Sequence, residues 1–290
     1  MKYATVGLIG KPEHEGTHVS LTALTHYLHA KGCRVLIESR LHEEMDDDRL
    51  TSAELVTIGQ EADLAIVVGG DGNMLGAARV LSRFDIHVVG VNRGNLGFLT
   101  DINPDDINTD LDAIFSGEGI IEQRFLLEVD VFRHESLKST NVAVNEVVLH
   151  HGKVAHMMEF EVDVNGKFMF SQRSDGLIVA TPTGSTAYSL SCGGPIIFPR
   201  SGNFVITPVA PHNLNVRPVV ISDNSVVSFE IEGRGENFIC TLDSRFEIIK
   251  SHYQLAVRKN DFTINLVRLE DVSFLRTIRE KLTWGKDIRN

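Results

Sequence analysis

The sequence has no apolar stretch long enough to cross a bilayer as a helix. The run that follows residues 1–5 is strand-like and too short for the apolar region of a secretory signal. Cysteine is scarce, with 3 residues that lie far apart and are odd in number: Cys33, Cys192 and Cys240. This usage favours buried, reduced thiols over a disulfide framework or a zinc knuckle. We therefore expect a cytoplasmic protein without a membrane span.

Basic residues are also few. The chain has 28 lysines and arginines against 39 aspartates and glutamates, which gives a net charge of −11. No basic stripe offsets this balance, so nucleic acid and anionic membranes are not expected partners. With 290 residues, of which 42% are hydrophobic, the chain can build one large or two ordinary domains.

Three familiar site motifs are missing or match only formally. Gly10-Lys11 lacks the upstream glycine and the following Ser or Thr of a Walker loop. The Rossmann spacing fails because Gly76 follows Gly70-x-Gly72 one residue late. Residues 14–18 fit H-E-x-x-H, but they contain a glycine and lie in a predicted loop, so we interpret this zinc-protease match as chance.

The strongest local signal is residues 63–75, where an apolar run ends in Gly69, Gly70 and Gly72 around Asp71. A helical pattern follows at once, which indicates a buried strand, a tight loop and a helix N-terminus. Free N–H groups and the positive end of the helix dipole make such a loop an anion site. A carboxylate in such a loop would repel phosphate, so its presence there indicates a role such as taking a proton or holding a metal. Asp71 is therefore a candidate base or metal ligand; the alternative is that it only caps the helix.

The first half of the chain favours a parallel sheet. Short apolar runs near residues 5–9, 33–38, 63–68 and 86–91 are separated by helical patterns, which is typical of βαβ units. Residues 92–100 then form a second glycine-punctuated loop after a strand. Ligands of open α/β sheets bind at this edge, so the two loops predict a cleft. Phe98 would either present its ring to a flat ligand or simply pack.

From about residue 120 the pattern alternates, which predicts half-buried strands in a separate, mostly antiparallel β domain. Asn165-Gly166 between two such runs predicts a hairpin. A helical tail with Trp284 as a packing anchor is expected to pack back on the first domain. The predicted fold is thus an α/β domain with a parallel sheet over residues 1–120, a β-rich domain over 121–270 and a C-terminal helix within 271–290.

Two stretches of the second domain point to chemistry. Asn145-Glu146 is a polar pair inside an apolar run, and a buried Glu needs partners or a ligand that supplies hydroxyls. Residues 174–191 end a strand in a turn rich in hydroxyls. Thr183, Ser185 and Thr186 could be helix caps, but so dense a set beside Tyr188 suits a polar ligand better. Ser185 lacks the G-x-S-x-G surroundings of a hydrolase nucleophile.

Taken together, these motifs resemble those of the NAD kinases. The resemblance rests on Gly-Gly-Asp-Gly at 69–72, Asn-x-Gly-x-Leu-Gly-Phe at 92–98, Asn145-Glu146, and Asp175-Gly176 followed by Thr-Pro-Thr-Gly-Ser-Thr-Ala-Tyr at 181–188. It spans most of the chain. Gly-Gly-Asp-Gly alone also occurs in diacylglycerol-type lipid kinases and 6-phosphofructokinases, so the later motifs narrow the family.

The resemblance implies transfer of the ATP γ-phosphoryl to the 2′-hydroxyl of the adenosine ribose of NAD, with a divalent cation, usually Mg²⁺. It also implies a homotetramer or a larger homo-oligomer, and for this chain we expect a homotetramer. It places the catalytic aspartate at Asp71 and phosphate contacts at Gly69, Gly70 and Gly72. It implies NAD contacts at Gly72, Phe98, Asn145, Glu146, His156, Arg173, Asp175, Thr186, Ala187, Tyr188, Ser189, Leu190, Ser191 and Arg245. Arg245 departs from close relatives, which have Gln there. The metal ligands cannot be identified from the sequence.

Two other functions remain open at this point. A lipid kinase could share the glycine loop, although the acidic composition and the lack of a basic amphipathic segment disfavour it. A catalytically silent NAD(P)-binding sensor would keep the binding motifs, although the intact Asp71 argues against this alternative.

Overall fold

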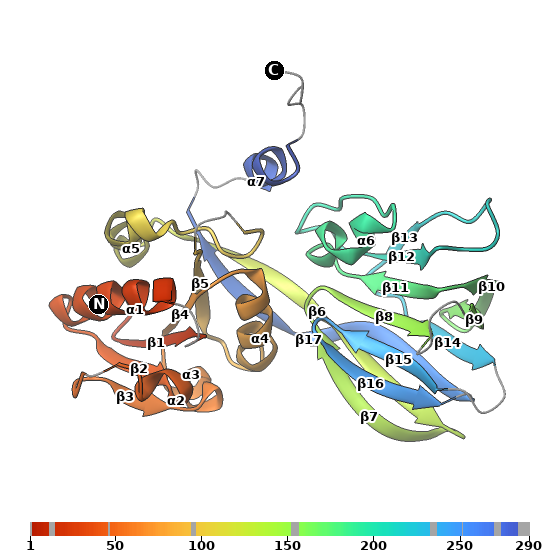
Figure 1. The fold of residues 1–290 in the computed structure, drawn as a ribbon, viewed down its shortest axis with the longest axis horizontal. Helices are drawn as coiled ribbons and strands as arrows, with labels where there is room; N and C mark the ends of the chain where they lie inside the picture. The colour runs from red at the N-terminus through yellow and green to blue at the C-terminus, as the bar shows by residue number, and fades with distance from the viewer. Residues whose placement is uncertain are drawn as a thin grey trace. The chain divides into compact units, whose positions relative to one another are not determined.

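The computed structural model describes residues 2–11, 15–45, 47–93, 97–151, 157–232, 237–250, 252–269 and 274–283 (Figure 1). The chain forms two compact units: unit 1 comprises residues 1–123 and 264–290, and unit 2 comprises residues 124–263. Unit 2 is therefore inserted within the sequence of unit 1, and β17 (Tyr253–Arg268) runs across the second boundary. The expected domain limits lay at 120/121 and 270/271, a few residues from these boundaries.

Unit 1 is built on a parallel sheet in the order β5-β4-β1-β2-β3, with the C-terminal end of β17 beside β5. The strands are β1 (Thr5–Gly10), β2 (Arg34–Glu38), β3 (Thr51–Ala53), β4 (Leu64–Val68) and β5 (His87–Val91). Four of them occupy the predicted apolar runs. The short β3 was not predicted, because three residues give no periodicity to detect.

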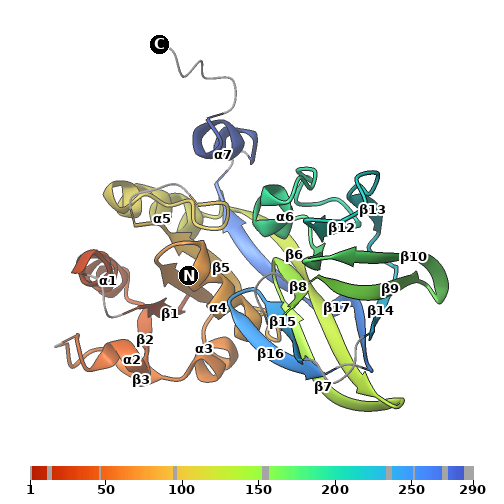
Figure 2. The ribbon, with the colours of Figure 1, turned by 45° about the vertical axis from the view of Figure 1, so that its right-hand side comes forward.

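The helices of unit 1 cover both faces of this sheet. They are α1 (Glu15–Ala30), α2 (Ser39–His42), α3 (Leu55–Glu61), α4 (Asp71–Leu81), α5 (Ile107–Ser116) and α7 (Phe274–Lys281), with a 3₁₀ turn η1 (Pro104–Asp106) before α5. Figures 1 and 2 show α1 and α5 on one face of the sheet and α3 on the other. On the first face, Leu24 and Leu28 are fully buried and pack into the same core as Val6 and Leu111. The Asn103 side chain caps η1 by accepting the Asp105 N–H at 3.2 Å.

Unit 2 is a β-structure with two sheets. One is antiparallel in the order β13-β12-β11-β8-β15-β16; the other contains β10, β9, β14 and β17, with β6 paired to β17 and to β7. The strands are β6 (Ile120–Arg133), β7 (Ser136–Ala143), β8 (Glu146–His151), β9 (Met158–Val164), β10 (Lys167–Ser174), β11 (Gly176–Ala180), β12 (Asn203–Val209), β13 (Val219–Ser222), β14 (Val227–Glu232), β15 (Asn237–Leu242) and β16 (Arg245–Lys250). The inner faces of the two sheets share one core, in which Leu149 from β8 and Phe160 from β9 are fully buried.

The alternation seen in the sequence reflects this arrangement, because each strand buries every second side chain. The hairpin predicted at Asn165-Gly166 joins β9 to β10, and both residues have positive φ, 55° and 70°. Such a turn matches the twist of the flanking strands. The predicted fold class is confirmed: an α/β part with a parallel sheet, a mostly antiparallel part and a helix near the C-terminus.

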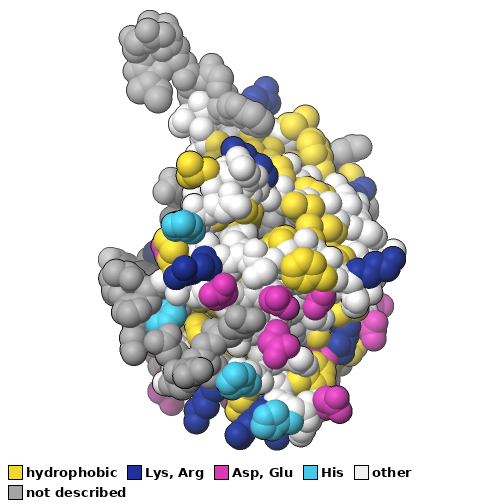
Figure 3. All heavy atoms as spheres, turned by 90° about the vertical axis from the view of Figure 1, so that its right-hand side faces the viewer, with side chains coloured by type: hydrophobic (Ala, Val, Ile, Leu, Met, Phe, Trp, Pro, Cys, Tyr) yellow, Lys and Arg dark blue, Asp and Glu magenta, His cyan; other side chains and the backbone are white. Residues whose placement is uncertain are grey.

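Several large apolar side chains of unit 2 lie on the surface. Phe246 and Ile248 on β16 are 71% and 59% exposed, and Phe168 on β10 is 63% exposed. Figure 3 shows one face of the molecule on which hydrophobic side chains gather beside a group of acidic ones. No helix in the described part of the chain has both the length and the apolar character that a membrane crossing requires.

Candidate active site

Asp71 is the first residue of α4. Strand β4 ends at Val68, and the Gly69 N–H donates to Val91 O of β5 at 2.9 Å. Gly70 is the N-cap of the helix, with extended backbone (φ −94°, ψ −176°). The alternative that Asp71 caps the helix is therefore wrong: its carboxylate points elsewhere, and glycine occupies the cap position.

The Asp71 carboxylate is held by the second predicted loop. Its Oδ2 accepts the Phe98 N–H at 3.0 Å, and its Oδ1 accepts the Leu99 N–H at 3.0 Å and the Thr100 hydroxyl at 3.5 Å. A Cβ on Gly97 would lie 2.2 Å from Asp71 Oδ1, so only glycine lets the loop approach this closely. The structure thus brings together the two loops that the sequence placed at one sheet edge; residues 94–96 lie outside the described part.

Arg268, at the end of β17, fixes the same loop. Its guanidinium pairs with Asp101, reaches Glu122 at 3.4 Å and donates to Phe98 O at 3.0 Å. The Arg268 and Asp101 side chains are each only 9% exposed. Sequence reasoning missed Arg268, because its partners lie more than one hundred positions earlier in the chain.

Replacing Arg268 with Met is expected to lower the free energy of unfolding by about 3–5 kcal/mol, because it leaves buried carboxylates without their cation. Urea denaturation at neutral pH measures this. The matched control is Arg276→Met, whose partner Glu280 is 2.9 Å away on the surface of α7 and whose loss should cost about 0.5 kcal/mol or less. Equal effects of the two substitutions would contradict the proposed role of Arg268.

In unit 2, the predicted pair Asn145-Glu146 is positioned by Asp243. The Asp243 carboxylate accepts three successive backbone N–H groups, from Val144 at 2.9 Å, Asn145 at 2.8 Å and Glu146 at 3.2 Å. Sequence reasoning missed Asp243, since its partners lie about one hundred positions earlier in the chain. Burial raises the pKa of Asp243, and the backbone donors partly offset this.

Glu146 is a buried carboxyl, and one of its oxygens lacks a hydrogen-bond partner. It is 8% exposed, and its Oε2 is enclosed without a hydrogen-bond partner. Burial and the nearby Asp243 raise the pKa of Glu146 to about 7, although the Tyr188 and Ser189 N–H groups favour its charged form. Buried acceptors are normally satisfied by a hydrogen-bond donor, which for Glu146 can come from water or from a ligand.

The hydroxyl-rich turn, residues 181–191, packs against this pair. The Thr181 N–H donates to Asn145 O at 2.9 Å, and a Cβ on Gly184 would lie 2.1 Å from the same oxygen. Ser185 Oγ donates to Pro182 O and accepts the Ile197 N–H at 2.9 Å, so this side chain is occupied internally. Much of the hydroxyl density therefore builds the turn itself.

The remaining predicted contacts differ in exposure. Ser189 Oγ is buried at 2.8 Å from the Thr207 hydroxyl, so the Ser189 side chain is not open to a ligand. The exposed residues are Arg173, Asp175, Tyr188 and Ser191, and the half-buried ones are Thr186, Ala187, Leu190 and Arg245. Burial raises the pKa of Tyr188, and the charges of Asp175 and Glu146 add to this. His156 lies outside the described residues.

Two family models match the chain. The ATP-NAD kinase N-terminal domain matches residues 6–119, and the ATP-NAD kinase C-terminal domain matches residues 144–269. The chain belongs to the ATP-NAD kinase family.

Full-length relatives of this family support the assignment. An NAD kinase of Aeromonas salmonicida is 48% identical over 289 residues, which cover 99% of this chain and 98% of that protein. An NAD kinase of Pseudoalteromonas translucida is 49% identical over 292 residues, covering 98% and 97%. The resemblance inferred from the motifs is confirmed.

Solved structures share the fold at low identity. Yeast NADH kinase in complex with NADH has a TM-score of 0.89 and 23% identity, covering 98% of this chain and 89% of that one. An NAD kinase from Archaeoglobus fulgidus in complex with ATP has a TM-score of 0.70 and 22% identity, covering 97% of each chain. At these identities the likeness concerns the fold alone.

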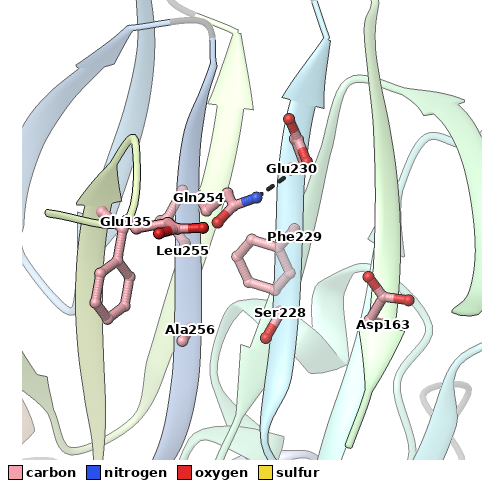
Figure 4. A pocket seen from close by; sticks show the side chains of 9 residues that line it. Glu135, Asp163, Ser228, Phe229, Glu230, Gln254, Leu255 and Ala256 are labelled. Carbon is pink, nitrogen blue, oxygen red and sulfur yellow. Dashed lines mark hydrogen bonds between the residues drawn. The ribbon is translucent and has the colours of Figure 1, made fainter. Parts of the chain in front are cut away.

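A separate pocket of about 360 Å³ lies on the sheet of unit 2 that contains β9, β14 and β17 (Figure 4). Three carboxylates line it, from Glu135, Asp163 and Glu230, and Gln254 donates to Glu230 at 3.1 Å. None of the site residues that the sequence analysis predicts for this chain lines the pocket. Its negative charge does not suit a phosphate-bearing ligand.

Proposed function

We propose that this chain transfers the γ-phosphoryl group of ATP to the 2′-hydroxyl of the adenosine ribose of NAD and so forms NADP. The observation that carries the proposal is the Asp71 carboxylate at the start of α4, fixed by two backbone N–H groups within a glycine turn. Membership of the ATP-NAD kinase family supports the same reaction.

The 2′-hydroxyl of the ribose is a weak nucleophile, so the reaction needs a base. Asp71 Oδ2 accepts the proton of the 2′-hydroxyl while the ribose oxygen bonds to the γ-phosphorus. The bond from that phosphorus to the bridging oxygen of ADP breaks in the same step. General-base catalysis of this kind contributes about 10²–10⁴-fold. The N–H groups of Gly70 and Gly72 and the positive end of the α4 dipole stabilise the phosphates. The Gly69 N–H is already bound to Val91 O, so Gly69 shapes the turn.

A divalent cation, in our proposal Mg²⁺, accompanies the ATP. The Asp71 carboxylate already accepts several donors, and among the described residues no group of three or more His, Cys, Asp or Glu side chains could hold an ion. This donor set would fit a cation held mainly by the substrate phosphates. When bound, the cation neutralises phosphate charge during transfer.

We assign phosphate binding to the first domain and NAD binding to the second. The Glu146 carboxylate accepts the ribose hydroxyls, and Asn145 orients the adenosine. Phe98, Arg173, Asp175, Arg245, His156 and residues 186–191 complete the proposed NAD contacts. For Ser189 we assign a supporting role, because its hydroxyl is enclosed and its N–H already favours the Glu146 carboxylate.

The direct test incubates the purified protein with NAD or NADH, ATP or polyphosphate, and Mg²⁺, and measures NADP(H). We expect NADP formation that requires the phosphoryl donor. NAD binding without turnover would favour the sensor alternative, and phosphorylation of a lipid in place of NAD would overturn the proposal.

We propose further that the protein acts as a cytoplasmic homotetramer. The edge strand β16 exposes Phe246 and Ile248, and exposed apolar edges are normally covered by a partner. Light scattering at micromolar concentration should therefore give about four times the chain mass of 32.1 kDa. A fully active monomer would refute this, and Phe246→Ser, on the outer face of β16, should weaken the assembly.

A further inference from the structure

A lysine of α7 lies on the Asp71 carboxylate. The Lys281 Nζ is 3.1 Å from Asp71 Oδ2, although the two residues are 210 positions apart in the sequence. Their side chains are only 32% and 27% exposed, so the pair is partly shielded from water. Neither the motifs nor the helical pattern of the tail pointed to this contact.

The lysine is held in place by its own helix. Its ammonium lies 4.8 Å from the centroid of the Phe98 ring, and Phe274 at the start of α7 packs on that ring at 6.1 Å. Thr277 and Ile278 are buried, which fixes the helix against unit 1. Helix α7 therefore places the Lys281 ammonium beside Asp71.

This contact occupies the atom that the reaction needs. Asp71 Oδ2 already accepts the Phe98 N–H, and Lys281 takes its other acceptor direction. A ribose hydroxyl can donate to Oδ2 only after the ammonium has left. In the free enzyme, the Lys281 ammonium therefore blocks Asp71 Oδ2, the proposed base.

The same ammonium is placed for a phosphate. Asp71 is the first residue of α4, so Lys281 stands beside the glycine turn that receives the phosphates. Arg268, a second cation near this loop, is engaged by Asp101 and Glu122. A terminal phosphate carries more negative charge than one carboxylate, and lysine is a flexible point charge that can follow it.

We propose that Lys281 is a phosphate-binding residue that exchanges partners during the reaction. In the free enzyme it pairs with Asp71. When ATP enters, the ammonium moves to the γ-phosphoryl oxygens, neutralises their charge and uncovers Asp71 Oδ2 for the ribose proton. The base therefore becomes available only when the phosphoryl donor is in place. This inference rests on the proposed function, because it assumes that ATP binds at the turn.

The first test compares ATP with ADP by calorimetry in the absence of NAD, so it does not depend on NADP formation. Lys281→Met should weaken ATP binding about tenfold or more and leave ADP binding within about twofold, since only ATP carries the γ-phosphate. Lys281→Arg should restore most of the ATP affinity. The matched control is Arg279→Met, which removes an exposed cation from the same helix and should change neither ligand.

The second test follows the exchange itself by NMR of ¹⁵N-labelled lysine side chains, with the Lys281 signal assigned from its absence in Lys281→Met. ATP should move this signal and ADP should leave it in place. In Asp71→Asn the free-enzyme signal should differ from wild type, whereas the ATP-bound signal should coincide with that of wild type.

Three outcomes would overturn the inference: equal loss of ATP and ADP affinity in Lys281→Met, an equal loss in Arg279→Met, or a Lys281 signal that ATP does not move. A wild-type protein that forms no NADP would instead refute the proposed function. A protein that forms NADP and binds ATP unchanged in Lys281→Met would refute this inference alone.

Discussion

Asp71→Asn is expected to lower kcat by about 10²-fold or more, with the affinity for NAD changed by no more than a few-fold. Asparagine keeps the shape of the side chain but cannot accept the ribose proton. The helix keeps its cap, since Gly70 and not Asp71 occupies that position. Steady-state kinetics at saturating ATP and NAD measure the effect.

The substitution has a predictable cost in stability, which the measurement must separate from catalysis. Each Asp71 oxygen accepts one backbone N–H, from Phe98 or Leu99, and the amide nitrogen of Asn would face one of these donors. Losing that bond costs about 1–3 kcal/mol. Asp105→Asn, at an exposed acid in unit 1, is the matched control. Wild-type turnover in a folded, saturated Asp71→Asn protein would disprove the assignment, and Glu146 would then be the next carboxylate to test.

Glu146→Gln is expected to stabilise the protein at pH 8 and to weaken NAD binding. The folded-state pKa of Glu146 is raised from 4.5 to about 7, so the folded protein binds this proton more tightly than the unfolded chain. The resulting stability is fully present below pH 4.5 and is lost as the pH rises through 7. At pH 8 the buried charge costs about 3 kcal/mol, which a neutral glutamine avoids.

NAD binding should respond in the opposite direction. Ribose hydroxyls donate to the ionised carboxylate, and such bonds contribute about 1.5–3 kcal/mol, so Glu146→Gln should weaken NAD about tenfold to a hundredfold at pH 8. Wild-type affinity should rise with pH through about 7 and then level off, whereas the variant should show no such rise.

Thermal unfolding at pH 5 and pH 8, with NAD titrations at the same pH values, tests both parts of the Glu146 prediction. The exposed Glu159→Gln on β9 serves as the control and should change stability by about 0.5 kcal/mol or less. A Glu146→Gln protein that is less stable than wild type at pH 8 would contradict the prediction. It would mean that the carboxylate is ionised and fully bonded in the free protein.

The parts of this molecule that the sequence predicted depend on local signals. The apolar runs of the first half, the alternation of the second half and the Asn165-Gly166 turn each follow from residues close together in the chain. The glycine turn at Asp71 was predicted for the same reason. The sequence left open whether Asp71 caps helix α4. The backbone angles of Gly70 decide this, and the sequence does not report them.

The missed residues are those whose roles depend on distant partners. Asp243 binds a loop about one hundred positions away, and Arg268 pairs with Asp101 across 167 positions. Nothing in the sequence near Lys281 indicates a contact with Asp71. The hydroxyl turn was recognised, but sequence could not separate the hydroxyls that build the turn, such as Ser185, from those that face outward.

The insertion of unit 2 within unit 1 has a consequence for the order of folding during synthesis. The loop at residues 97–101 leaves the ribosome early, but its buried cation, Arg268, follows only after all of unit 2. Domains usually fold in the order of their synthesis. Here the first unit to appear is the last to be completed, so a nascent chain can hold a folded second unit while the loop that binds Asp71 is still unsupported.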